Sequence, residues 1–349
     1  FFMDKIDYII VGLGIAGISI CEQLRKNNKS FVVIDAKSSA TSVAGGVVNP
    51  CVLKRFNPVW NSDSFFEYAF PFYKNLEAFI SQEIVLETRV LKIFASNEDQ
   101  NNWIVASDKK ELEKYLSSTI VKNDNESIQA PFNFGELKST FQLNTKLLIE
   151  KYTHHLRQSK SLLEEAFDYK KLRHNKKEVT YKSIIANKIV FAQGVSALQN
   201  PYFPKDILHS KKGEYITIKA IDLKCNSVLK GKYFIIPQGN DLYKVGATFD
   251  HKSNTHIISE KGKNELVGAL KKMISVPFQM VDQEVGMRPT VLNKRPIVGN
   301  LSNFENIYFL NGLGTHGLLM APLLSKNLYD FMENKVALPS EININRFFN

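Results

Sequence analysis

The chain has few cysteines and no long hydrophobic run, and both shortages narrow the class of protein it can be. Its three cysteines, Cys21, Cys51 and Cys225, are odd in number and share no C-x-x-C spacing. We therefore expect neither a disulfide framework nor a metal site. Such cysteine usage is typical of a reducing compartment, and the cytoplasm is the default expectation. The uncharged apolar stretch 8–21 is too short and too rich in glycine to span a bilayer, and no membrane span is predicted.

Positive charge is in excess, whereas the rest of the composition is ordinary. The 349 residues provide enough length for two domains, and 44 % hydrophobic with 23 % charged residues is typical of a globular chain. The formal net charge is +10. A basic surface would attract anions, including nucleic acid, but a general excess of lysine gives the same net charge. The densest basic cluster, 170–177, is expected to be a solvated hairpin tip.

The first 35 residues carry the strongest local pattern. An apolar run at 8–11 predicts a buried parallel strand, which ends at three glycines spaced G-x-G-x-x-G; a second apolar run at 31–35 ends on a carboxylate. In a nucleotide-binding βαβ unit such glycines allow the tight turn, the approach of a pyrophosphate and the close packing of helix on strand, while the acid reaches the ribose. The unit predicts a dinucleotide site and leaves NAD and FAD open. Its predicted contacts are Gly12, Leu13, Gly14, Ile15, Ala16, Gly17, Asp35, Ala36 and Lys37.

The order of patterns along the chain predicts an α/β fold made of interleaved segments. Helical spacing at 64–81 and 144–157 is separated by short strands and polar turns at 84–141, and alternating strands fill much of 206–280. A second strand, glycine turn and helix at 306–332 returns the chain to the first unit. We expect a doubly wound FAD- or NAD(P)-binding domain with an inserted, mostly antiparallel α+β substrate domain. The nucleotide-binding domain is assigned to 1–82, 140–205 and 281–349, and the substrate domain to 83–139 and 206–280.

Several blocks together resemble the FAD-dependent D-amino-acid oxidase (DAO) superfamily, which includes glycine oxidase and sarcosine oxidase. These blocks are the glycine unit at 11–17, Ala-Gly-Gly at 44–46, Phe-Ala-Gln-Gly at 191–194, Lys-Gly-Glu at 212–214, 243–248, Gly-Met-Arg-Pro-Thr at 286–290 with 295–299, and 311–322. The resemblance spans nearly the whole chain and implies FAD as the cofactor. Two pieces, 44–50 and 312–322, look most like the FAD domain of the bifunctional enzyme that oxidatively removes a carboxymethyl group from a modified tRNA wobble uridine.

The resemblance also implies roles for individual residues. Arg288 matches the position that binds the substrate carboxylate, and Lys244 matches a lysine placed over the flavin, where it would act on the reaction with oxygen. Tyr233 and Tyr215 are candidate aromatic walls or substrate donors, although strand tyrosines more often serve packing. No cysteine lies near Arg288, so FAD is expected to bind non-covalently. The remaining predicted FAD contacts are Ser42, Val43, Ala44, Gly45, Gly46, Val47, Phe167, Gln193, Gly194, Arg288, Gly312, Gly314, Thr315, His316, Gly317 and Leu318.

Three classes of function follow from these patterns. The first is an FAD-dependent oxidoreductase that oxidises the C–N bond of an amino acid or N-substituted glycine, with a carboxylate on the substrate and oxygen or another electron acceptor. A modified base in tRNA is the alternative substrate. The second class is a non-catalytic protein that binds FAD or nucleic acid, and the third is an NAD-dependent dehydrogenase. The Ala44-Gly45-Gly46 loop and the C-terminal glycine turn argue against the third class.

Overall fold

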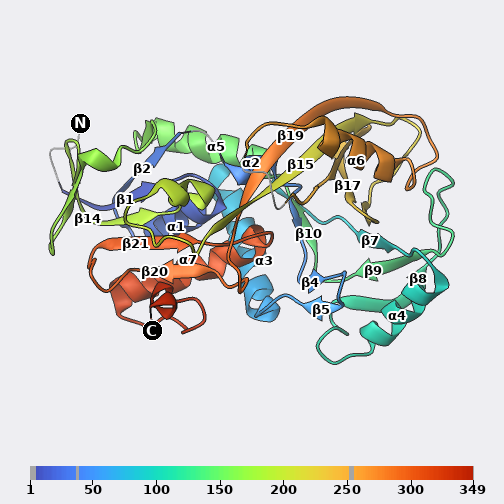
Figure 1. The fold of residues 1–349 in the computed structure, drawn as a ribbon, viewed down its shortest axis with the longest axis horizontal. Coiled ribbons are helices and arrows are strands. Elements are labelled where there is room, and N and C mark those ends of the chain that lie inside the picture. The colour runs from blue at the N-terminus through green and yellow to red at the C-terminus, as the bar shows by residue number, and fades with distance from the viewer. Residues whose placement is uncertain (1–4, 37–38, 251–254, 349) are drawn as a thin grey trace.

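The computed structural model describes residues 5–36, 39–250 and 255–348, which form two halves side by side, each built on a mixed or antiparallel sheet (Figure 1). The helices are α1 (Ile15–Lys26), α2 (Ala40–Val43), α3 (Ser62–Ile80), α4 (Asn97–Ser107), α5 (Thr145–Gln158), α6 (Glu260–Leu270) and α7 (Gly317–Asn334). Short 3₁₀ segments are η1 (Tyr169–Lys171), η2 (Gly194–Gln199) and η3 (Ile344–Phe347).

The first sheet has the strand order β11-β2-β1-β14-β13-β12, with β21 also pairing with β14 and β20 pairing with β21. β1 is parallel to both β2 and β14, and β14 is parallel to β21, as expected for a doubly wound domain. α1 and α7 pack against one another on this sheet, and α3 packs on α7. The strands are β1 (Ile6–Val11), β2 (Phe31–Asp35), β11 (Leu162–Glu164), β12 (Leu172–His174), β13 (Val179–Tyr181), β14 (Ile184–Phe191), β20 (Ile297–Gly299) and β21 (Ile307–Asn311).

The second sheet has the order β19-β15-β18-β17-β16-β7-β9-β8 and is antiparallel except for the β16–β7 pair. Figure 1 shows its long strands β15 and β19 reaching from this half towards the first. The strands are β7 (Val90–Ile93), β8 (Leu116–Val121), β9 (Phe134–Leu137), β15 (His209–Lys219), β16 (Val228–Lys230), β17 (Phe234–Gly239), β18 (Leu242–Gly246) and β19 (Gln279–Thr290). Two small sheets join β3 (Val47–Val48), β10 (Phe141–Leu143) and β6 (Val85–Leu86), and β4 (Cys51–Val52) with β5 (Asn57–Pro58).

The glycines of the first turn hold α1 tightly against β1. Gly12 has a φ of +102°, and a Cβ at Gly17 would lie only 1.9 Å from the carbonyl oxygen of Gly12. A side chain at either position would therefore force the helix away from the strand. This close packing sets the N-terminus of α1 at the carboxyl edge of the sheet.

The predicted α/β class is confirmed, as are the opening βαβ unit and the helices that correspond to α3, α5 and α7. Three helices were not predicted: the four-residue α2, and α4 within 84–141 and α6 within 206–280, where only strands and turns were expected. α4 is mainly polar and buries few of its side chains, Trp103 among them, so its sequence shows little helical periodicity. The division into two domains stays a prediction. Because β19 pairs with β15 along its length, the sheet favours a final boundary after β19 rather than at residue 281.

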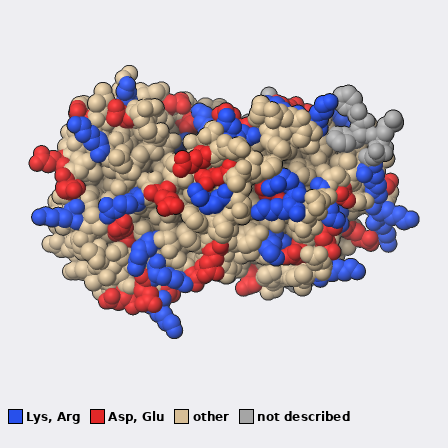
Figure 2. Space-filling model, turned by 180° about the vertical axis from the view of Figure 1, so that it is seen from behind, with Lys and Arg blue, Asp and Glu red and all other residues tan. Residues whose placement is uncertain are grey.

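Within the described residues, no helix is long and apolar enough to cross a membrane, and no group of three or more His, Cys, Asp or Glu side chains is placed to hold a metal ion. Figure 2 shows the face opposite to that of Figure 1, where Lys and Arg lie interspersed with Asp and Glu rather than in a single stripe. On this face the basic side chains do not form a continuous stripe that would indicate a nucleic-acid site.

Candidate active site

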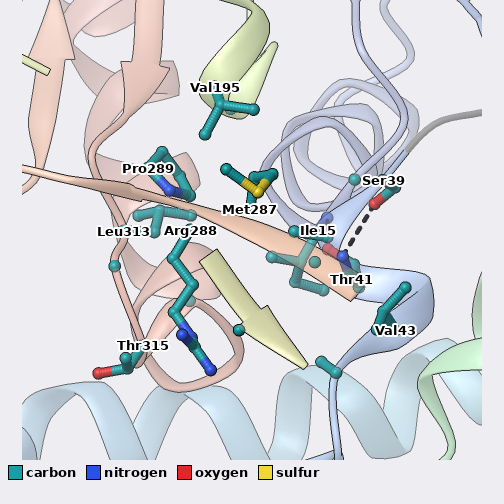
Figure 3. Close-up of a pocket in the computed structure, with 18 of the residues that line it drawn as sticks. Ile15, Ser39, Thr41, Val43, Val195, Met287, Arg288, Pro289, Leu313 and Thr315 are labelled. Atoms are coloured by element: carbon teal, nitrogen blue, oxygen red, sulfur yellow. Dashed lines mark hydrogen bonds between the residues drawn. The ribbon is translucent and has the colours of Figure 1, made fainter. Parts of the chain in front are cut away.

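A cavity of about 1170 Å³ runs from the glycine turn after β1 to the end of the second sheet. It exceeds the roughly 300–1,000 Å³ of ordinary small-molecule pockets. Figure 3 shows side chains from both halves converging on it, with Arg288 extending from β19. Its wall contains most of the residues predicted to bind FAD, namely Gly12, Leu13, Gly14, Ile15, Ala16, Asp35, Ala36, Ser42, Val43, Ala44, Gly45, Gly46, Val47, Phe167, Gln193, Gly194, Arg288, Gly314, Thr315, His316, Gly317 and Leu318.

At the nucleotide end the first glycine turn is fixed by side chains from neighbouring segments. The Asp35 carboxylate accepts a hydrogen bond from the Leu13 N–H at 2.9 Å. The Ile15 N–H, at the start of α1, donates to Thr41 Oγ1 at 3.0 Å, and the Thr41 N–H donates to Ser39 Oγ (Figure 3). Asp35 therefore orients the turn in addition to its predicted contact with a ribose.

Phe167 lines the same end of the cavity. Its ring stacks on Tyr181 with centroids 4.4 Å apart and meets Phe191 edge-on. These contacts fix the Phe167 ring in the cavity wall, which suits its predicted role beside an adenine ring.

Two predicted FAD residues lie behind the wall of the cavity. Gly17 packs against the backbone of Gly12, and a Cβ at Gly312, whose φ is +71°, would lie 2.7 Å from Val291. Gly17 lets α1 approach the first glycine turn and Gly312 shapes the C-terminal turn, while their neighbours Ala16 and Leu313 line the cavity. Lys37 lies outside the described residues.

Arg288 is the principal cation of the interior. Its Nη1 donates to the carbonyl oxygens of Thr248 at 3.3 Å and Lys212 at 3.5 Å, and its guanidinium lies 5.2 Å from the ring centroid of Phe249. Among the described residues no carboxylate forms an ion pair with it. Burial lowers the pKa of Arg288, while the neighbouring Tyr215 hydroxyl opposes this shift. Since an arginine remains charged even so, this side chain presents an unneutralised cation to the cavity.

Tyr215 connects Arg288 to the loop that follows α2. Its hydroxyl accepts a hydrogen bond from the Gly45 N–H at 3.3 Å. Its ring lies where a side chain at Gly246 would be, because a Cβ there would lie 2.4 Å from Cδ1 of the tyrosine. Tyr215 thus lines the cavity, and its role as an aromatic wall for a substrate stays a prediction.

Lys244 and Tyr233, both predicted to be catalytic, form hydrogen bonds with carboxylates of the chain itself. Lys244 is absent from the described wall: its Nζ donates to Glu284 at 2.7 Å and lies 5.1 Å from the ring centroid of Tyr215. Tyr233 lines the cavity, but its hydroxyl donates to Glu265 of α6, and burial followed by this hydrogen bond raises the pKa of Tyr233 well above its ordinary value. The catalytic roles of Lys244 and Tyr233 stay predictions.

The C-terminal glycine turn brings the start of α7 to the cavity. Thr315 and His316 lie in its wall, and His316 precedes the first residue of the helix. Burial, followed by the nearby Lys294 charge, lowers the pKa of His316 to about 4, so the imidazole is neutral at physiological pH. The positive end of the α7 dipole can stabilise negative charge on a ligand bound here.

Sequence reasoning missed several wall residues. Ser39 is the N-cap of the short helix α2 and Thr41 lies within it; this segment has no recognisable motif, although Ser and Thr near a glycine turn are common donors and caps. Lys54, Lys230 and Lys232 also line the cavity. They come from a loop and a hairpin far apart in the sequence, so no local pattern could have joined them.

The doubly wound sheet, the glycine turn after β1 and the cavity beside it together define a nucleotide-binding protein. The profile of the DAO family, described as FAD dependent oxidoreductase, matches residues 7–330, and the chain belongs to this family. It is 21 % identical over 359 aligned residues to glycine oxidase of Bacillus subtilis (strain 168), an alignment that covers 94 % of this chain and 93 % of that protein.

Solved structures have the same fold. Iminodiacetate oxidase from Chelativorans sp. BNC1 superimposes with a TM-score of 0.79 at 18 % identity, covering 96 % of this chain and 97 % of the other. L-α-glycerophosphate oxidase from Mycoplasma pneumoniae, a structure with FAD bound, superimposes with a TM-score of 0.74 at 16 % identity and covers 95 % of each chain.

The cofactor is FAD, and the cavity fits it. The N-termini of α1 and α7 both open into the cavity, where free N–H groups and dipoles favour phosphate and a reduced ring. A Cβ at Gly194 or Gly314 would meet no atom closer than 4.0 Å, so these glycines leave space along the wall for a ligand to approach the backbone.

Proposed function

We propose that the protein oxidises the C–N bond of an amine that carries a carboxylate, such as an amino acid or an N-substituted glycine. The observation that carries this proposal is Arg288, a cation in the cavity wall with no carboxylate partner among the described residues. A substrate carboxylate would supply that partner through the paired donors of the guanidinium. The glycine oxidase and iminodiacetate oxidase named above support this substrate class.

The residues of the chain would mainly bind and orient. Arg288 would hold the carboxylate, Tyr215 would hold the guanidinium, and the start of α7 would stabilise negative charge on the bound cofactor. Bound FAD would supply the acceptor for the hydride equivalent that the amine carbon loses, together with a proton from nitrogen, on becoming an imine, and oxygen or another acceptor would reoxidise it. Water then converts the imine to a carbonyl compound and a free amine.

Arg288→Ala tests this function. The variant should keep FAD, seen as an unchanged visible spectrum, and should raise KM for sarcosine or glycine about a hundredfold, because two charge-assisted hydrogen bonds are lost. Arg288→Lys retains the positive charge but lacks the paired N–H donors of the guanidinium, and it should give an intermediate KM. An unchanged KM in Arg288→Ala would show that Arg288 does not bind the substrate carboxylate.

The tRNA substrate is the weaker alternative. The comparisons give it no support, and the mixed charge of the surface in Figure 2 is unlike a continuous phosphate-binding stripe. Flavin reduction by undermodified tRNA, with a steep dependence on salt, would favour it over a free amine.

A further inference from the structure

The end of the cavity formed by the second sheet is basic. Its wall includes a lysine group that we define as Lys54, Lys230 and Lys232. The described carboxylates of the wall are Asp35 and Glu165, which belong to the nucleotide end beside β2 and β11. The substrate end therefore has an excess of positive charge beyond Arg288.

The three lysines come from two segments that pack together. Lys230 and Lys232 lie at the β16–β17 hairpin, and Lys54 follows β4. β4 and its following residue pack on that hairpin through a buried apolar cluster that includes Cys51, Leu53, Val228 and Ile236, with Phe234 against it. The packing keeps both segments at the same end of the cavity.

Lys230 is the member held most firmly. Its Nζ donates to the carbonyl oxygens of Gly231 and Lys232 at 3.0 Å each and lies 4.8 Å from the ring centroid of Phe234. An ammonium has three donors, and in the described part of the chain none of them meets a carboxylate. Burial, followed by repulsion from Lys92, lowers the pKa of Lys230 to about 8. Lys232, by contrast, is 63 % exposed and lies 3.8 Å from Glu265, a weak pairing.

A partly buried cation without a counter-ion is costly unless a ligand supplies the opposite charge. Arg288 already has a substrate carboxylate as its partner under the proposed function, so an anion bound at Lys230 would be a different group. We propose that the lysine group binds a second anionic group of the substrate. This inference rests on the proposed function and narrows it to N-substituted glycines whose substituent ends in a carboxylate or phosphonate.

Matched substrates test the proposal on the FAD-loaded enzyme. N-(carboxymethyl)glycine and N-(phosphonomethyl)glycine carry the second anion, whereas N-(carbamoylmethyl)glycine replaces it with a neutral amide of the same shape. We expect kcat/KM for the better anionic substrate to exceed that for the amide by about tenfold or more, the worth of one charge-assisted hydrogen bond. Preference for one of the two anions identifies which group the site accommodates.

Lys230→Met should reduce the ratio of anionic to amide kcat/KM about tenfold. Lys109→Met is the matched control, since Lys109 is exposed and lies outside the cavity wall, and it should leave the ratio unchanged. Equal kcat/KM for the anions and the amide, or a ratio unaffected by Lys230→Met, would overturn the second-anion site while leaving the proposed function intact. Flavin reduction by none of the three compounds nor by sarcosine would instead count against the proposed function. Reduction by tRNA alone would overturn both.

Discussion

The guanidinium of Arg288 occupies the space that a side chain at Gly213 would need: a Cβ at position 213 would lie 2.3 Å from Nη2 of Arg288. The two residues lie on neighbouring strands, β19 and β15, and Gly213 pairs with Gly286 in the register. Because Gly213 on β15 has no side chain, the guanidinium of Arg288 on β19 can lie in this space. The position of Arg288 depends on a glycine 75 residues earlier in the chain, since 288 − 213 = 75.

Gly213→Ala should displace the guanidinium without removing it. We expect KM for a carboxylate substrate to rise about tenfold, because one charge-assisted hydrogen bond is lost or misaligned. FAD binding should persist, and steady-state kinetics with the visible spectrum measure both. Gly268→Ala is the matched control, because a Cβ there meets nothing within 4 Å and the residue lies inside α6. Equal KM values for Gly213→Ala and Gly268→Ala would show that Gly213 does not position Arg288 for substrate binding.

Asp35→Asn should weaken FAD binding while preserving the fold. The amide oxygen can still accept from the Leu13 N–H, but a neutral group binds ribose hydroxyls less strongly than a carboxylate. We expect the Kd for FAD to rise about tenfold in a titration of the apoprotein followed by flavin fluorescence. Asp63→Asn, at a half-exposed surface position, should bind FAD like the parent. If Asp35→Asn also bound FAD as tightly as the parent, the Asp35 side chain would only orient the glycine turn and would not bind the ribose.

Lys244→Met separates a catalytic from a packing role. Because the ammonium bonds Glu284 and lies outside the described wall, we expect reoxidation of the reduced flavin by oxygen to change by less than about tenfold, below the usual worth of a catalytic proton or charge contact. Stopped-flow mixing of the reduced enzyme with oxygen measures this rate. A larger decrease would support the oxygen-activating role that the family resemblance implies.

Glu333 should make stability depend on acid pH. It accepts from Lys188 and Lys29 at 2.6 Å each and from the Tyr8 hydroxyl. Burial opposes ionisation, but these hydrogen bonds lower the pKa of Glu333 to about 2. A depressed carboxyl pKa contributes stability above the unfolded value of about 4.3, and this contribution is lost as the pH falls from there towards the folded value.

Glu333→Gln should therefore reduce the slope of unfolding free energy against pH in that acid window, and urea unfolding at stepped pH measures it. Glu111→Gln, at an exposed position, should retain the slope of the parent. If the slope for Glu333→Gln equalled that of the parent, the three hydrogen bonds of Glu333 would not contribute to the pH dependence of the unfolding free energy.

The nucleotide half of the site could be predicted because its signal is local. Gly12, Gly14 and Gly17 act through one turn, and Asp35 lies on the next strand, so their spacing in the sequence fixes their positions in space. The substrate half could not be derived in this way. Arg288 was identified only through the family resemblance, and its dependence on Gly213 arises from strand pairing between distant segments. The lysine group likewise exists only once β4 packs on the β16–β17 hairpin.

Anaerobic flavin reduction is the most direct test of whether the protein oxidises amines whose carboxylate binds Arg288. The FAD-loaded protein is mixed without oxygen with sarcosine, with N-(carboxymethyl)glycine and with the carboxyl-amide of sarcosine, and the visible absorbance of the flavin is followed. We expect bleaching by the compounds that carry a carboxylate for Arg288 and markedly slower bleaching by the amide. Equal bleaching by the amide, or none by any carboxylated amine, would contradict this expectation.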